Sequence, residues 1–307
     1  MPPILLATLT ETAAVVLACC AAGVAFFLIG IWTARKEIAQ ARGADKIVTL
    51  GTICFAIPLA VFGAEHLYGV ELVAGAVPKY MPWPLFWAYF VGVGLLAAAA
   101  SIATGIAVRW SGLLFGIMMF LFVAMIDLPG TLAHPQNRIF WTLTLREASF
   151  GAAGLILAGK AMDGHGRGPA MLITIGRIVI GITAIFYGVQ HFLHATALPG
   201  VPLQKEMPAW IPGRPLIDYV TGAALLVGGG SFLALWKTRM VATGVGAWIL
   251  LLVLVIYSPV LIDALATPKM AVQMEGINYF ADTLLYAGTI LVLASAMPRL
   301  APGKSSK

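Results

Sequence analysis

Long apolar stretches recur along the whole chain. Runs of predominantly apolar residues alternate with short polar or proline-containing breaks, and a helix of about 20 such residues crosses the hydrocarbon core of a bilayer. The expected spans are approximately 12–33, 47–70, 84–107, 111–131, 140–160, 171–194, 215–236, 240–262 and 277–298. The pattern predicts an all-α polytopic membrane protein of about nine transmembrane helices.

Composition excludes an ordinary soluble protein. Of the 307 residues, 60% are hydrophobic and 10% are charged, whereas soluble domains contain about 25% charged residues. The net charge of +6 does not indicate nucleic acid, because the basic residues lie singly between apolar runs and form no basic helix face. Membrane lipid is the expected surrounding, and no break is long enough to form a soluble domain.

The basic residues predict the orientation. Most of the 19 Lys and Arg residues fall in alternate breaks, beginning with the segment 35–46, and basic loops stay in the cytoplasm. The N-terminus is therefore expected outside and the C-terminus in the cytoplasm, most simply in a bacterial inner (plasma) membrane. The first apolar run is too long for a signal-peptide core, so we interpret it as a retained span.

The sequence contains an internal repeat. Residues 62–66 (FGAEH) match 187–191 (YGVQH), and residues 81–92 match 211–222 at an offset of 130 residues. Arginine and proline recur at the same offset, as Arg109 and Arg239 and as Pro129 and Pro259. Spans 2–5 and spans 6–9 are thus expected to be two copies of one four-helix unit.

This repeat predicts three parts of the chain. They are an N-terminal span with a basic cytoplasmic loop (1–46), a first four-helix repeat (47–160) and a second four-helix repeat (171–298). Because each copy holds an even number of spans, both insert in the same direction. The pseudo-two-fold axis should lie along the membrane normal.

Ionisable residues inside apolar spans are expensive and therefore mark candidate sites. Glu65 and His66 lie late in the second span, and Gln190 and His191 occupy the matching positions of the sixth. One alternative is an interfacial histidine that only bonds a neighbouring helix. The recurrence of the histidine in both copies favours a ligand or proton site.

A second group of polar residues is expected at the same side of the membrane. Asp127 precedes Pro129 in the fourth span, Arg146 and Glu147 open the fifth, and Asp282 is early in the ninth. These residues either form a structural ion pair or neutralise and orient the histidine and glutamate site across the bundle.

Aromatic residues accompany these groups. Trp83 and Trp210 lie in proline-rich outer loops, Tyr187 begins the second histidine motif, and His194 follows His191 by one helical turn. The tryptophans suit an aromatic belt at the membrane interface, and they also suit the mouth of a pocket for a quinone. We consider these five residues candidates for cofactor binding.

Metal and haem are not predicted. Cys19, Cys20 and Cys54 lie inside spans without a C-x-x-C spacing, so they are interpreted as small apolar side chains. His191 and His194 share a helix face, but no nearby sequence supplies a third metal ligand. The sequence also contains no haem attachment motif and no nucleotide-binding motif.

The motifs resemble those of a known membrane family. A four-span unit with F/Y-G-x-x-H in its first helix and a proline- and tryptophan-containing outer loop, clearest at residues 207–213 (MPAWIPG), is similar to the DoxX/DoxD-like family. Here the unit is present twice, and an extra span precedes it. The resemblance implies a small membrane subunit of a thiosulfate:quinone oxidoreductase or of another redox complex, or a role in assembly or trafficking.

Three functions follow as hypotheses. In the first, the chain is a quinone-interacting subunit of a respiratory or sulfur-oxidising complex, His66 or His191 bonds the quinone, and Glu65, Asp127 and Glu147 relay protons. Since the sequence encodes no electron carrier, a redox partner protein would supply it, and the chain could also form an oligomer. The alternatives are a non-enzymatic anchor or assembly factor and a small-solute transporter.

Overall fold

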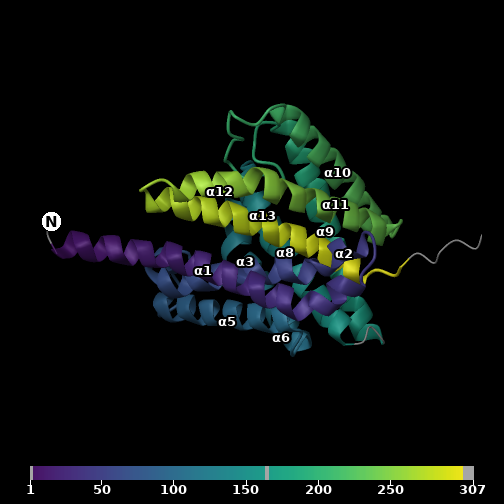
Figure 1. The fold of residues 1–307 in the computed structure, drawn as a ribbon, viewed down its shortest axis with the longest axis horizontal. Helices are drawn as coiled ribbons and strands as arrows, with labels where there is room; N and C mark the ends of the chain where they lie inside the picture. The colour runs from purple at the N-terminus through teal and green to yellow at the C-terminus, as the bar shows by residue number, and fades with distance from the viewer. Residues whose placement is uncertain (1–2, 163–165, 300–307) are drawn as a thin grey trace, which may run out of the picture.

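The fold is an all-helical bundle. A computed structural model describes residues 3–162 and 166–299, and within these ranges it contains no strand, only one isolated bridge between Ala197 and Glu206. The long helices run side by side along one direction, with α1 along one flank (Figure 1). Of the described helices, eight are long and apolar enough to cross a membrane. The chain is a polytopic α-helical membrane protein.

The helices follow the expected spans. The first half contains α1 (Pro3–Gln40), α2 (Asp45–Thr49), α3 (Gly51–Tyr68), α4 (Val70–Ala74), α5 (Pro84–Thr104), α6 (Val108–Phe122), η1 (Val123–Asp127), α7 (Leu128–Ala133) and α8 (Arg138–Ala161). The second contains α9 (Arg167–Leu193), α10 (Arg214–Ala234), α11 (Thr238–Leu252), η2 (Val253–Tyr257), α12 (Ser258–Leu265) and α13 (Met270–Ala296). The N-terminal helix is longer than expected, because the basic residues from position 35 onward continue it to Gln40.

The helix α8 differs from the other long helices. It has 24 residues, enough to cross the core at about 1.5 Å per residue, but it is not among the eight apolar helices. It carries Arg146 and Glu147, and it packs along α6, α9 and α13 in the interior of the bundle. The expected fifth span can therefore be less apolar because protein, rather than lipid, surrounds it.

The two halves share unusual backbone features at the offset of 130 residues. A π-helical segment occurs at Val123–Asp127 and again at Val253–Tyr257, each followed by a proline. Proline lacks the N–H that an α-helix needs and crowds the preceding turn, and a widened turn accommodates it. Left-handed residues precede α6 and α11 at Ala107 and Lys237. These features support the two-repeat organisation.

Each half places its first helix on the last helix of the other half. A Cβ atom at Gly51 of α3 would lie 2.8 Å from Leu291 of α13, and one at Gly176 of α9 would lie 2.6 Å from the Ala152 carbonyl of α8. Within each half, Gly116 meets Leu155, as Gly246 meets Leu291. The contacts pair α8 with α13 at an offset of 136 residues, which makes Arg146 and Asp282 equivalent positions.

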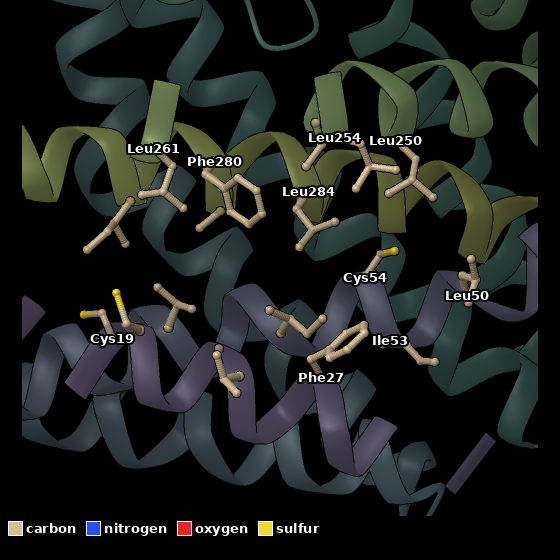
Figure 2. A pocket seen from close by; sticks show the side chains of 18 of the residues that line it. Cys19, Phe27, Leu50, Ile53, Cys54, Leu250, Leu254, Leu261, Phe280 and Leu284 are labelled. Atoms are coloured by element: carbon tan, nitrogen blue, oxygen red, sulfur yellow. The ribbon is translucent and has the colours of Figure 1, made fainter. Parts of the chain in front are cut away.

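The helix α1 lies outside both halves. It packs along α3, where a Cβ atom at Gly23 would lie 3.3 Å from Val61. On the other side of α3, an apolar groove separates α1 from α11 and α12 (Figure 2).

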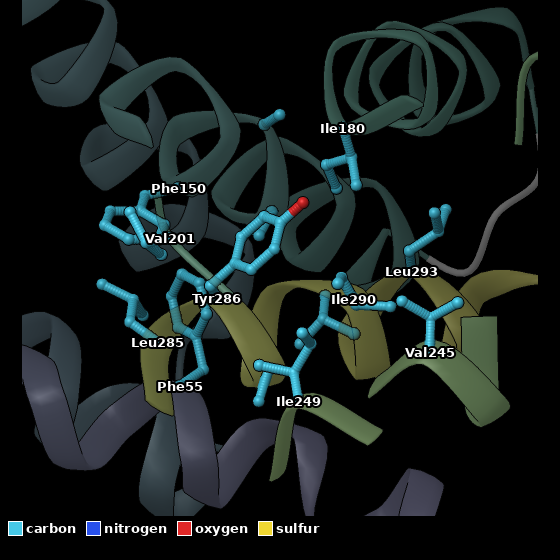
Figure 3. Packing of buried hydrophobic residues seen from close by; sticks show 14 of the residues in the cluster. Phe55, Phe150, Ile180, Val201, Val245, Ile249, Leu285, Tyr286, Ile290 and Leu293 are labelled. Carbon is cyan, nitrogen blue, oxygen red and sulfur yellow. The ribbon is translucent and has the colours of Figure 1, made fainter. Parts of the chain in front are cut away.

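One apolar core joins the two halves. Tyr286 of α13 is fully buried among side chains from α3, α8, α9 and α11 (Figure 3). Val201, from the loop between α9 and α10, is also in this core and is 1% exposed. A loop residue at the centre of a helical bundle is unusual, and it bears directly on the candidate sites.

Candidate functional site

A cavity of about 200 Å³ lies in the first half of the bundle. Side chains of α3, α5, α6, α8 and α13 surround it, and most of them are apolar. Its polar lining residues are His66, Arg146, Glu147, Asn278 and Asp282. Three residues predicted as site residues therefore meet at one cavity, joined by Asp282, which the sequence also singled out.

Arg146 holds two carboxylates at this cavity. Its Nη1 lies 2.6 Å from Asp282 Oδ2, and its Nη2 lies 2.7 Å from Glu147 Oε1. The side chains are 20%, 15% and 7% exposed for Arg146, Glu147 and Asp282. Charges so far from water are stable only when paired. The pair Arg146–Asp282 also joins equivalent positions of the two halves, and it therefore lies at the pseudo-two-fold axis.

His66 presents one free ring nitrogen. Its Nδ1 lies 2.8 Å from the Phe62 carbonyl oxygen, and since a carbonyl only accepts, Nδ1 carries the proton. The neutral ring then has an acceptor at Nε2, which no described residue hydrogen-bonds. His66 can therefore accept a hydrogen bond, or a proton, from a molecule in the cavity.

Glu65 lies on the far side of a bridging amide. Asn278 Nδ2 donates to Glu65 Oε1 at 3.3 Å, and Asn278 itself lines the cavity. Glu65 is 9% exposed and does not line the cavity. The arrangement connects the carboxylate to the cavity through one side chain.

His191, the counterpart of His66, is fully bonded and lines no cavity. Its Nδ1 lies 2.9 Å from Asp218 Oδ1, and the Gly200 N–H donates to its Nε2 at 3.1 Å. Because Nε2 accepts, the ring is neutral with its proton on Nδ1, which donates to the carboxylate. Both side chains are 0% exposed. The expectation that His191 binds a ligand is therefore not met, since neither ring nitrogen is free.

The loop between α9 and α10 fills the place of a second cavity. Residues 197–202 are buried. Tyr257 Oη donates to the Pro199 carbonyl at 2.9 Å, and Arg138 Nη1 donates to the Pro202 carbonyl at 2.8 Å. We call residues 197–202 the plug.

The contacts of the plug match the cavity of the first half position by position. A Cβ atom at Gly200 would lie 3.1 Å from Thr283 and 3.9 Å from Ile249, the counterparts of Glu147 and Met119. Thr142, which accompanies Arg138 at Pro202, is the counterpart of Asn278. The plug therefore occupies the space that is an open cavity in the first half.

Other predicted site residues are placed apart from the cavity. Tyr187 is fully buried and donates to the Thr142 carbonyl at 3.0 Å. Gln190 is 7% exposed, and Oε1 has no hydrogen-bond partner among the described residues. Asp127 ends η1 and does not line the cavity. These three residues are not brought to one site with His66.

The outer aromatic residues also lie elsewhere. Trp83 is 74% exposed at the start of α5, and Trp210 is 52% exposed beside a small apolar pocket formed with Trp248. His194 is exposed just beyond α9, where desolvation and the charge of Arg138 lower the pKa of its imidazole. Neither tryptophan covers the cavity.

Two polar residues of the sites were missed from the sequence. Asp218 and Asn278 each stand alone in an apolar helix, and a lone carboxylate in a span is a signal that could have identified Asp218. Asn278 is uncharged, so only its position marks it. Among the described residues, no group of three His, Cys, Asp or Glu side chains could hold a metal ion.

Searches for similar proteins return no match. No family model, no curated protein and no solved structure is similar to this chain. The cavity and its residues are therefore the basis for a function.

Proposed function

We propose that the protein is a quinone-interacting membrane subunit of a respiratory or sulfur-oxidising redox complex, and that the quinol head group enters the cavity of the first half. The free Nε2 of His66 carries this proposal, because it is a proton acceptor at an otherwise largely apolar cavity. The resemblance to DoxX/DoxD-like proteins points in the same direction.

The size of the cavity fits a head group rather than a whole quinone. At about 200 Å³ it is smaller than the roughly 300–1,000 Å³ of sites that enclose a drug-sized ligand. The isoprenoid chain would remain among lipids.

The polar residues suggest a division of roles. His66 Nε2 would accept a hydrogen bond from the quinol hydroxyl and take its proton as general base. Arg146 would hold Glu147 and Asp282 in place, and Asn278 would connect the cavity to Glu65 for onward proton transfer. Oxidation of quinol to quinone releases two protons and two electrons, and the electrons would pass to a redox centre in a partner protein.

The proposal includes an orientation. The basic residues at one end of the bundle favour a cytoplasmic position for that end, with the N-terminus outside and the chain in a bacterial inner membrane. His66 lies at the opposite end of α3, so protons would leave on the outer side.

Binding of short-chain ubiquinone and menaquinone analogues to the purified full chain tests the proposal. The His66→Ala variant should weaken binding of the reduced analogue at least tenfold, since it removes the only proposed acceptor, whereas His194→Ala should bind like the parent. Met119→Trp should also abolish binding by filling the cavity, and Leu121→Trp, on the exposed face of the same helix, is its control. Absence of binding to the parent would leave the anchor or assembly role.

A further inference from the structure

The apolar groove beside α1 is a second binding feature of the molecule. It has a volume of about 480 Å³, and every residue that lines it is apolar or a cysteine. Phe27 of α1 faces Leu254 and Leu284 across it, from α12's neighbour η2 and from α13 (Figure 2). Such a surface matches a hydrocarbon chain.

The length of the groove matches one leaflet. Its lining on α1 runs from Cys19 to Ile31, which at 1.5 Å per residue is roughly 18 Å. Half of a hydrocarbon core about 30 Å thick is about 15 Å. A single acyl chain therefore fits along the groove.

A polar pocket of about 640 Å³ continues the groove at the basic end of the bundle. On α13, Leu284 lines the groove and Ser295 lines the pocket. On α11, the corresponding residues are Leu250 and Arg239. Each pair is 11 residues apart, which is about three turns, so both sites lie on the same helix faces.

The charges of the pocket favour an anion. Arg239 Nη2 lies 2.6 Å from Asp45 Oδ1, and Arg299 Nη2 lies 3.3 Å from Asp45 Oδ2, so two arginines share one carboxylate. Lys160 donates to the Ser295 hydroxyl at 3.1 Å. With Glu37 as the other lining carboxylate, the cationic side chains of the pocket outnumber the anionic ones.

We propose that the groove and the pocket together bind one anionic phospholipid, with an acyl chain along the groove and the phosphate beside Lys160 and Arg299. Basic pockets between helices are suited to anionic head groups, and the adjoining groove supplies the chain site. The quinone cavity is separate, because Ile57 and Val61 of α3 line the groove whereas Leu59 and Phe62 line the cavity. This inference does not depend on quinone binding.

Native mass spectrometry of the purified full chain tests the head-group site, with dioleoyl phosphatidylglycerol and dioleoyl phosphatidylcholine as the probes. The parent should retain phosphatidylglycerol in preference to phosphatidylcholine. The Lys160→Gln/Arg299→Gln variant should lose about fivefold in this preference for each residue replaced. Arg109→Gln removes a charge outside the pocket and should keep the parental preference.

A second pair of variants tests the groove. Val24 lines it and is 60% exposed, so Val24→Trp should fill it and weaken retention of both lipids several-fold without disturbing the core. Leu17→Trp, 70% exposed on the same helix and outside the groove, should have no effect. Inorganic phosphate in excess should not displace the lipid from the parent.

Three results would overturn the proposal. They are equal retention of the two lipids by the parent, unchanged preference in the charge variant, and unchanged retention in Val24→Trp. Displacement by inorganic phosphate would instead identify the pocket as a site for the free anion. If the charge variant is insensitive and a short-chain quinone competes with lipid in the groove, the occupant is a quinone chain.

Discussion

The two halves of the bundle begin from the same histidine motif and reach opposite outcomes. In the first half, His66 has a free ring nitrogen at a cavity lined by Arg146 and Glu147. In the second half, His191 is bonded on both nitrogens, by Asp218 and by the plug. The same residue on the same helix face therefore prepares a site in one copy and anchors a loop in the other.

The difference arises outside the histidines. Position 88, which corresponds to Asp218, is an alanine, so the first half offers His66 no carboxylate partner. The loop after α3 forms the short helix α4, which has no buried residue, whereas the loop after α9 turns inward as the plug. A duplicated unit can thus keep one binding cavity and use the second for stability.

Breaking the bond between His191 and Asp218 should have the largest effect. The variant His191→Ala leaves the buried carboxylate and the Gly200 N–H without their partner, and loss of one member of a buried pair costs about 3–5 kcal/mol. His66→Ala removes one bond to a helix carbonyl and should cost about 1 kcal/mol. Unfolding of the two variants in mixed micelles measures the difference. Equal destabilisation would mean that the two histidines are equivalent after all.

Disturbing the plug should have an intermediate effect. Gly200 has φ of +116° and its Cβ position is crowded by Thr283, so Gly200→Ala should cost about 1–3 kcal/mol. It should also expose the plug, which a cysteine at Val201 would report through faster maleimide labelling. Gly230→Ala, where nothing lies within 4 Å of the added atom, is the control and should leave both stability and labelling unchanged. Slow labelling in Gly200→Ala would show that the plug is held without this glycine.

Removing the native thiols should have the smallest effect. Cys19, Cys20 and Cys54 are free, and all three line the apolar groove rather than either histidine site. Their joint replacement by alanine should cost about 1–2 kcal/mol through lost packing and leave quinone-analogue binding unchanged. The same variant is the background for the labelling experiment. Loss of analogue binding by a folded protein would connect the thiols to the cavity.

The sequence determined the helices and much of their repetition. Apolar runs of spanning length predict the fold class, because a bilayer requires each backbone group to be bonded within its own helix. The offset of 130 residues and the prolines at 129 and 259 anticipate where the backbone features recur. The charges Arg146, Glu147 and Asp282 were identifiable because ionisable residues inside spans are costly.

Only the tertiary structure decided which half keeps a cavity. The plug is held by Arg138 of α8, Tyr257 of η2 and His191 of α9, and these residues are brought together by packing rather than by spacing along the chain. A local pattern contains no signal for contacts over such separations. For the same reason the sequence could not tell that Trp210 is exposed, that His191 is saturated, or that His66 alone retains a free nitrogen.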